Sequence, residues 1–169
     1  MPSLLPGRLL LFAVFLLISV NLHARESEIS RPLFFTAPAA EAVWYGRTSP
    51  SIGYGFAFGS DDTVSIGLKG MYSMPLSEND ISTLEITFFL RIYLSAADIA
   101  NGFFVQLTHG FAVFSGESKI SLPTEGGAIS IGITAGRRFS LGNRFFIEPY
   151  IRGGYPYYGG VGLSAGVRF

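Results

Sequence analysis

Seven charged residues lie inside segments where apolar residues alternate with small or polar ones, and each occupies a small or polar position: Lys69, Glu85, Arg91, Arg138, Glu148, Arg152 and Arg168. Successive side chains of a strand point to opposite faces, so these charges would share the face opposite the apolar one. In a water-filled lumen they could bind or pass a small ion. In a packed lumen they would have to form salt bridges, because a buried charge needs a partner. The small, narrow interior expected below favours a salt-bridged plug.

Spacing predicts which of these charges meet. If 73–81 closes a simple hairpin, Lys69 lies opposite Glu85. The turns on either side of 145–153 place Glu148 diagonal to Arg138 and Arg168. Opposite charges at such cross-strand positions attract each other.

Other residues offer little chemistry. His109 falls on the apolar face, where a histidine with a serine could serve a lipid-modifying enzyme such as a lipid A deacylase. His109-Gly110-Phe111 has no serine two residues on, so we expect His109 near a rim, among headgroups. Glu85 and Glu148 have no evident water-filled cleft for hydrolysis. The chain has no cysteine and only two histidines, one of them within 1–24. These are too few ligands to suggest a metal site, and no cofactor is expected.

Composition narrows the class of protein. The chain has 169 residues, 49% of them hydrophobic and 14% charged, with 12 basic residues balanced by 12 acidic ones. This balance lacks the basic footprint of a nucleic-acid binder, so no nucleic-acid partner is expected. Many of the 21 glycines lie inside the apparent strands, where small residues would suit a narrow barrel interior.

The amino-terminal segment 1–24 reads as a cleavable signal peptide, with Arg8, an apolar run over 9–20 and a cleavage site after Ala24. A retained signal anchor is the alternative, but the run is shorter than the roughly 20 residues of a spanning helix. Segment 25–38, which contains Pro32 and Pro38, is expected to be a periplasmic lead-in without regular structure. No later segment is apolar enough for a spanning helix, so a membrane-embedded mature chain would be a closed barrel.

Alternation with a period of two predicts eight strands: a weak one at 39–45, then 51–58, 63–72, 82–94, 102–114, 128–139, 145–153 and 161–169. An even number of strands returns both ends to the periplasm, with the turns at 59–62, 95–101 and 140–144 there and the loops at 73–81, 115–127 and 154–160 outside. The last strand should pair with the weak first one. Aromatic girdles are expected at the inner rim (Phe58, Phe103, Phe139, Phe145 and Phe169) and the outer rim (Trp44, Tyr54, Tyr72, Tyr155, Tyr157 and Tyr158).

The order of these elements over 39–169 resembles the small outer-membrane β-barrel families of Gram-negative and spirochaete-type bacteria, including OmpA-like, OmpX-like and OmpW-like barrels. It is most similar to short uncharacterised barrels whose last strands read like "FFIEPYIRGGY" and "GLSAGVRF" here. A terminal aromatic after alternating apolar residues is similar to the signal read by the barrel-assembly machinery. The resemblance therefore implies that the machinery recognises Val161, Leu163, Ala165, Val167 and Phe169.

The sequence thus predicts an all-β fold: an eight-stranded antiparallel up-and-down transmembrane barrel in the cell outer membrane. We expect a monomer that contacts outer-membrane lipid, with a packed polar lumen and a structural or surface-interaction role. A narrow conduit for ions or small hydrophobic molecules is one alternative, and a lipid-modifying enzyme is another. A third is a soluble lipocalin-like barrel, which would turn its apolar residues inward.

Overall fold

The computed structural model describes residues 33–45, 48–59, 64–76, 81–94, 102–115 and 126–169. These ranges form antiparallel strands, and none of the described residues belongs to a helix that could cross a membrane. The predicted signal peptide, 1–24, lies outside the described residues. The strands are β1 (Leu33–Trp44), β2 (Thr48–Gly59), β3 (Val64–Ser73), β4 (Ser82–Tyr93), β5 (Phe103–Ser115), β6 (Gly126–Arg137), β7 (Phe139–Leu141), β8 (Phe145–Tyr155) and β9 (Gly159–Arg168).

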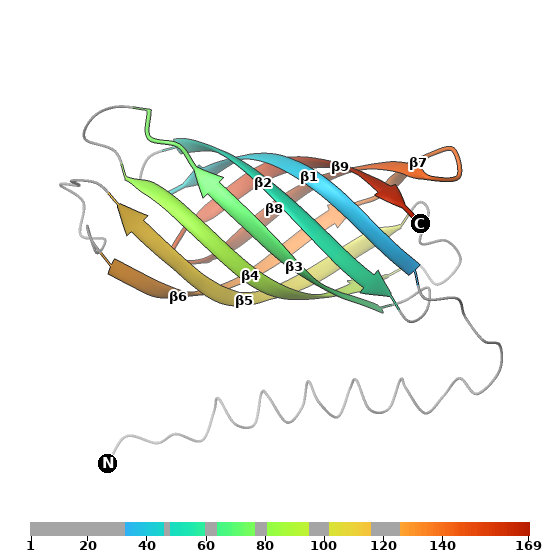
Figure 1. The fold of residues 1–169 in the computed structure, drawn as a ribbon, viewed down its shortest axis with the longest axis horizontal. Coiled ribbons are helices and arrows are strands. Elements are labelled where there is room, and N and C mark those ends of the chain that lie inside the picture. Colours follow the sequence, from blue (N-terminus) through green and yellow to red (C-terminus); the bar gives the residue numbers. More distant parts are fainter. Residues whose placement is uncertain (1–32, 46–47, 60–63, 77–80, 95–101, 116–125) are drawn as a thin grey trace, which may run out of the picture. The chain divides into compact units, whose positions relative to one another are not determined.

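The strands close into an eight-stranded barrel in which each strand is paired with its neighbours in sequence, and β9 returns to pair with β1 (Figure 1). Nine strands are assigned, but β6 and β7 both pair with β8 in one continuous register, so they form one stave. The break between them faces Pro149 of β8, which has no N–H to donate to the ladder. The predicted count of eight and the predicted pairing of the last strand with the first are confirmed.

The first strand starts earlier than the sequence pattern suggested. β1 begins at Leu33, so the expectation of an irregular lead-in up to residue 38 is wrong for its last part. Phe35 and Ala37 point inward, and these apolar inward residues hide the alternation on which the prediction relied. Pro38 is tolerated because its exposed ring points outward and the ladder to β9 is interrupted at Ala37 and Pro38, while the ladder to β2 is continuous.

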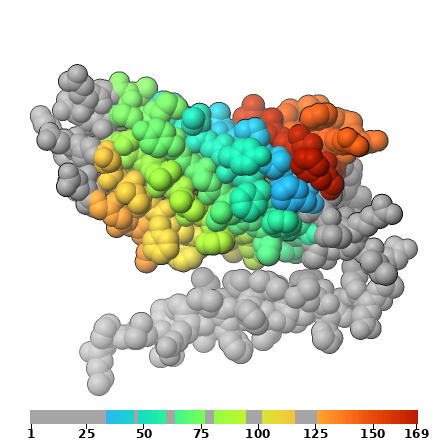
Figure 2. Space-filling view, in the orientation of Figure 1, coloured from blue at the N-terminus to red at the C-terminus, as the bar shows by residue number. Residues whose placement is uncertain are grey.

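The two faces of the wall differ as predicted. Large hydrophobic side chains such as Phe88, Phe111 and Ile151 point outward and are more than half exposed, at 68%, 66% and 61%. Apart from Val43 and Met71, the buried inward side chains are small, polar, charged or aromatic. In Figure 2 the side chains of β1 to β5 form a continuous outer wall. A lipocalin-like barrel with its apolar residues turned inward is therefore excluded.

The start of β1 and the carboxyl terminus lie at the same end of the barrel, where the Phe169 N–H donates to the Phe34 carbonyl at 2.8 Å. We call this end the terminal rim and the other end the loop rim. The predicted girdle phenylalanines lie exposed at the terminal rim, and Trp44, Tyr72, Tyr155 and Tyr158 lie exposed at the loop rim.

Two tyrosines were misplaced in the predicted outer girdle. The loop expected at 154–160 is shorter than predicted, because β8 runs to Tyr155 and β9 starts at Gly159. Tyr157 in this tight turn points into the lumen and is 1% exposed. Tyr54 lies in the middle of β2, where the Thr36 hydroxyl donates to its phenolic oxygen on the outer face.

Inward glycines fit against aromatic rings on the neighbouring strand. A Cβ atom at Gly67 would lie 2.4 Å from the ring of its cross-strand partner Phe89 and 2.3 Å from the Phe56 carbonyl. The same arrangement recurs at other direct cross-strand pairs: Gly136 with Phe104, Gly162 with Tyr150 and Gly166 with Phe146. The glycines thus leave the space in which the large inward rings pack, which explains why they occur inside strands.

Replacing Gly67 with alanine should destabilise the barrel by about 1–3 kcal/mol, because the new methyl group would overlap both a ring and a backbone carbonyl. Gly70→Ala on the same strand is the matched control, since a Cβ atom there meets nothing within 4 Å. Denaturant unfolding in lipid vesicles measures both variants. Equal stability of the two variants would contradict this packing.

Candidate functional site

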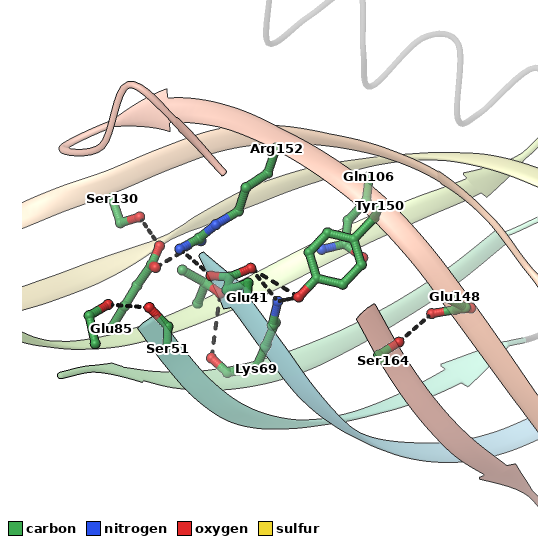
Figure 3. Close-up of polar contacts among 12 residues, drawn as sticks. Glu41, Ser51, Lys69, Glu85, Gln106, Ser130, Glu148, Tyr150, Arg152 and Ser164 are labelled. Carbon is green, nitrogen blue, oxygen red and sulfur yellow. Dashed lines mark hydrogen bonds and ion pairs between the residues drawn. The ribbon is translucent and has the colours of Figure 1, made fainter. Parts of the chain in front are cut away.

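The lumen holds two clusters of charged side chains. The first, which we call the Glu41 cluster, consists of Glu41, Lys69, Glu85 and Arg152 from β1, β3, β4 and β8 (Figure 3). Arg152 bridges the two carboxylates, with Nη2 2.6 Å from Glu41 Oε1 and Nη1 2.9 Å from Glu85 Oε2. Lys69 Nζ lies 3.7 Å from Glu41 Oε2, so two acids are balanced by two bases.

Hydroxyl groups complete the Glu41 cluster. The Tyr150 hydroxyl donates to Glu41 Oε2 at 2.9 Å and accepts from Lys69 Nζ at 3.1 Å. Ser130 donates to Glu85 Oε1. The ring of Tyr157 covers the Arg152 guanidinium at 3.9 Å from the ring centroid. Each carboxylate therefore has an opposite charge and a hydroxyl donor, the arrangement that offsets the cost of removing charges from water.

The second cluster, which we call the Glu148 cluster, consists of Arg91, Arg138 and Glu148. Glu148 Oε1 accepts from Arg138 Nε at 2.6 Å and from Arg91 Nη1 at 2.8 Å. Its second oxygen accepts from the Ser164 hydroxyl at 3.1 Å, and Figure 3 shows this pair apart from the residues around Glu41. Gln106 Oε1 accepts from Nε and Nη2 of Arg91 at 3.0 and 2.8 Å.

The Glu148 cluster carries one positive charge more than its carboxylate neutralises, and aromatic rings surround this excess charge. The guanidinium of Arg138 lies 4.0 Å from the ring centroid of Phe146 and 4.4 Å from that of Phe35. The guanidinium of Arg91 lies 4.1 Å from the centroid of Phe104. A desolvated cation over an aromatic face gains about 2 kcal/mol or more. Arg138 is fully buried, and among the described residues its Nη1 and Nη2 have no hydrogen-bond partner. The contacts with the rings compensate for these missing hydrogen bonds.

A small cavity separates the two clusters. It is lined by Lys69 and Tyr150 on one side and by Arg91, Glu148 and Ser164 on the other. The volume of this cavity is about 30 Å³. By this measure a single water needs about 10–15 Å³, so the cavity holds about two water molecules.

Apolar and aromatic side chains close the lumen beyond the clusters. Towards the loop rim, Tyr45, Phe114 and Tyr157 pack together with Val43 and Ala112. Burial raises the pKa of the Tyr45 and Tyr157 phenols, so both are neutral at physiological pH. Towards the terminal rim, buried rings enclose the Glu148 cluster: Phe35, Phe89, Tyr93, Phe104 and Phe146. Charged and apolar layers thus alternate along the barrel.

Lys69 does not lie opposite Glu85 as the sequence predicted. Thr87 is the partner of Lys69, and Met71 is the partner of Glu85. Alternation cannot detect this shift of two residues, because it leaves every side chain on its own face. Lys69 instead reaches Glu41 across β2, whose inward residues nearby are small, among them Gly53 and Gly55.

Arg138 meets Glu148 as predicted, but Arg168 does not. Glu148 pairs with Ser164 across the β8–β9 ladder, and Arg168 lies four residues farther along β9, about 13 Å away at the rise of a strand. Arg168 Nη2 instead donates to Ser140 Oγ at 3.3 Å and to the Asn143 carbonyl at 3.5 Å. The charges predicted to face inward do so, and all except Arg168 belong to one of the two clusters.

The expected rim position of His109 is also wrong. His109 lies in the middle of β5, exposed on the outer face between Phe88 of β4 and Ile131 of β6. Outward apolar residues of the predicted strand 102–114 lie on both sides of His109. Counting residues from the ends of that strand would therefore have placed His109 away from the rims. Among the described residues, no group of three or more potential metal ligands comes together.

The sequence prediction also missed residues that complete the clusters. Glu41 lies in the weak strand 39–45, on the face opposite Trp44, and it was left out of the predicted charge network. Because Trp44 was predicted to face outward, the opposite parity of Glu41 was the signal that could have included it. The alternation also places Gln106, Ser130, Tyr150 and Ser164 on the inward face, but it does not fix the register that brings a hydroxyl or an amide into a network.

The residues of the predicted assembly signal all lie on the outward face of β9 or directly after it. Val161, Leu163 and Phe169 are 59%, 51% and 72% exposed. Ala165 is also exposed, and Val167 is half-buried. Their backbones pair with β1 and β8, so in the closed barrel the side chains alone are accessible from outside.

Substituting Glu148 with glutamine should destabilise the barrel by about 3–5 kcal/mol, because two buried arginines would lose their carboxylate. Ser164→Ala is the control: it removes one hydrogen bond to Glu148, at a cost of about 1 kcal/mol, and leaves the charges unchanged. Denaturant unfolding in vesicles, together with the gel shift on heating, measures both. A Glu148→Gln variant no less stable than Ser164→Ala would show that Glu148 does not hold the lumen together.

Several solved outer-membrane barrels share the fold of this chain. The chain is similar to the amino-terminal β-barrel domain of OprF from Pseudomonas aeruginosa, with a TM-score of 0.60 and 13% identity over 81% of this chain and 97% of that one. It is similar to the outer membrane protein OprG from the same organism, with a TM-score of 0.56 and 11% identity over 85% and 98%. Ail from Yersinia pestis matches with a TM-score of 0.51 and 14% identity over 82% and 97%.

No curated protein matches the chain. A family model does match it, over residues 13–163, which is most of its length. The chain therefore belongs to the family described as "Protein of unknown function (DUF3575)".

Proposed function

We propose that this protein is a monomeric integral outer-membrane barrel with a sealed lumen, and that it acts through its outer surface as a structural or surface-interaction protein. The observation that carries the proposal is the lumen, in which the Glu41 and Glu148 clusters lie in series along the barrel. An eight-stranded interior is just wide enough for side chains to fill it, and here they do.

The outer surface supports the membrane location. Exposed large hydrophobic residues are distributed over the staves, and residues such as Ile52, Ile86, Phe111 and Leu163 lie between the two aromatic rims. A continuous apolar surface of this kind would cause aggregation in water, whereas it matches the outward apolar band of a lipid-embedded barrel. β1 to β6, β8 and β9 have 10 to 13 residues each, enough for a tilted strand, which needs about 9–11 residues to cross the hydrocarbon.

The lumen supports a closed barrel over a conduit. A passing ion would have to separate carboxylates and guanidinium groups that lie 2.6–2.9 Å apart in a buried environment. It would also have to displace the packed rings around Phe146 and Tyr157. The cavity between the clusters holds about two waters and is bounded by a charged cluster on either side.

We assign no catalytic step to this barrel. His109, which offers chemistry on the lipid face, has Phe88 and Ile131 as its cross-strand partners, and neither can activate or orient an imidazole. The remaining titratable groups of the described lumen are engaged in the two clusters or in the contacts of Arg168 and the buried tyrosines.

Planar bilayers containing the purified, heat-modifiable protein should show no channel steps, because both clusters would have to open together. A general porin added to the same bilayer is the positive control for the recording. Reproducible conductance steps whose frequency rises with the amount of folded protein would contradict the sealed lumen and favour a conduit.

Recognition of the last strand by the barrel-assembly machinery can be tested separately from stability. Phe169→Ala should lower the amount of folded barrel in the outer membrane of cells but leave refolding into vesicles unchanged, because the side chain is 72% exposed. Phe145→Ala removes another exposed aromatic residue at the terminal rim and is the control. Equal assembly of the two variants in cells would contradict a special role for Phe169.

A further inference from the structure

Arg137 differs from the other arginines of the strands because it points outward. It lies at the end of β6, opposite Phe103 of β5, and its side chain is exposed. The guanidinium lies 4.9 Å from the ring centroid of Phe103 and 4.9 Å from that of Phe139, both of which are exposed at the terminal rim. A charge is thus held by two rings of the aromatic girdle.

No acidic side chain among the described residues forms an ion pair with Arg137. Glu148 is the one acid between residues 126 and 169, and it faces the lumen, bound to Arg91 and Arg138. Contact with aromatic faces leaves the in-plane N–H groups of a guanidinium available, and their fork matches two oxygens of a phosphate.

The described residues around Arg137 are also basic. β7 and the turn after it project beyond the barrel beside the carboxyl terminus (Figure 1), and this turn carries the exposed Arg144. Arg168 lies nearby on β9, and its backbone N–H donates to the backbone carbonyl of Arg144 at 2.8 Å. Phe139, Leu141 and Phe145 on the same hairpin are exposed and apolar, as expected for a surface that meets acyl chains below a layer of phosphates.

We propose that Arg137, between Phe103 and Phe139, binds the phosphate group of an anionic phospholipid at the terminal rim. The inference rests on the proposed membrane location, with the terminal rim on the periplasmic side, so the bound lipid belongs to the leaflet that faces the periplasm. The acyl chains lie along the outward residues of β5 and β6, including Val105 and Ala135, and the phosphate accepts two hydrogen bonds from the guanidinium.

The test uses the full mature chain in nanodiscs of equimolar phosphatidylglycerol and phosphatidylcholine, followed by mass spectrometry of the lipids that stay bound on extraction. The wild-type protein should retain phosphatidylglycerol in preference to phosphatidylcholine. Arg137→Gln should reduce this preference about tenfold, as expected for the loss of a charge-assisted bidentate contact. Arg168→Gln, which removes the same charge from the same rim but from a guanidinium bonded to Ser140, should keep the preference.

Equal retention of the two lipids by the wild-type protein, or an equal loss in the two variants, would overturn the site. Binding of inorganic phosphate by the wild-type protein without any preference for phosphatidylglycerol would overturn a phospholipid as the ligand. The gel shift on heating separates these outcomes from failure of the proposed function. A chain that inserts and shifts but shows no preference contradicts the lipid site alone, whereas a chain that does not enter nanodiscs contradicts the membrane location as well.

Discussion

The structure depends on one constraint: charges placed in a lumen too narrow for bulk water must neutralise one another through direct contacts. Glu148 shows this most clearly, because one of its oxygens accepts hydrogen bonds from both Arg138 and Arg91, and its other oxygen accepts from Ser164. These residues come from β4, β8, β9 and the junction of β6 and β7. Since the carboxylate is satisfied only when four staves are in register, the cluster ties the closure of the barrel to its charge balance. Removing one partner leaves the other charge buried and unpaired, which costs far more free energy than an intact pair contributes.

The aromatic rings and the glycines are the second half of the same design. The excess positive charge of the Glu148 cluster is tolerated because the rings of Phe35, Phe104 and Phe146 cover the guanidinium groups. Those rings fit because glycine stands opposite Phe104 and Phe146 on the next strand. The abundance of glycine, which would weaken an ordinary sheet, is here the condition for packing large rings in a narrow barrel. Electrostatics and steric fit therefore constrain the same positions.

The pattern of the sequence predicted the face of each residue well, and its place along the barrel axis less well. A period of two assigns every inward charge to the lumen, which is why the strands, their number and the closing pair could be predicted. The same pattern is unchanged by a register shift of two, so the contact of Lys69 with Thr87 in place of Glu85 could not be found from it. The start of β1 could not be predicted either, because the inward Phe35 and the outward Pro38 disguise the alternation. Partners such as Glu41 and Lys69, on staves separated by β2, depend on three-dimensional closure and on the small residues between them.

Arg137 and Arg138 show how one local rule separates two roles. They are consecutive, so the alternation of a strand sends one guanidinium to the lipid and the other to the lumen. Both groups lie against aromatic rings, Phe103 and Phe139 for Arg137 and Phe35 and Phe146 for Arg138. Rings reduce the cost of a desolvated cation but do not neutralise it, so an anion beside either guanidinium stabilises it further. Inside, the protein supplies that anion as Glu148. Outside, the described residues supply none, and at the surface of a bilayer the phosphate layer is the nearest source of negative charge.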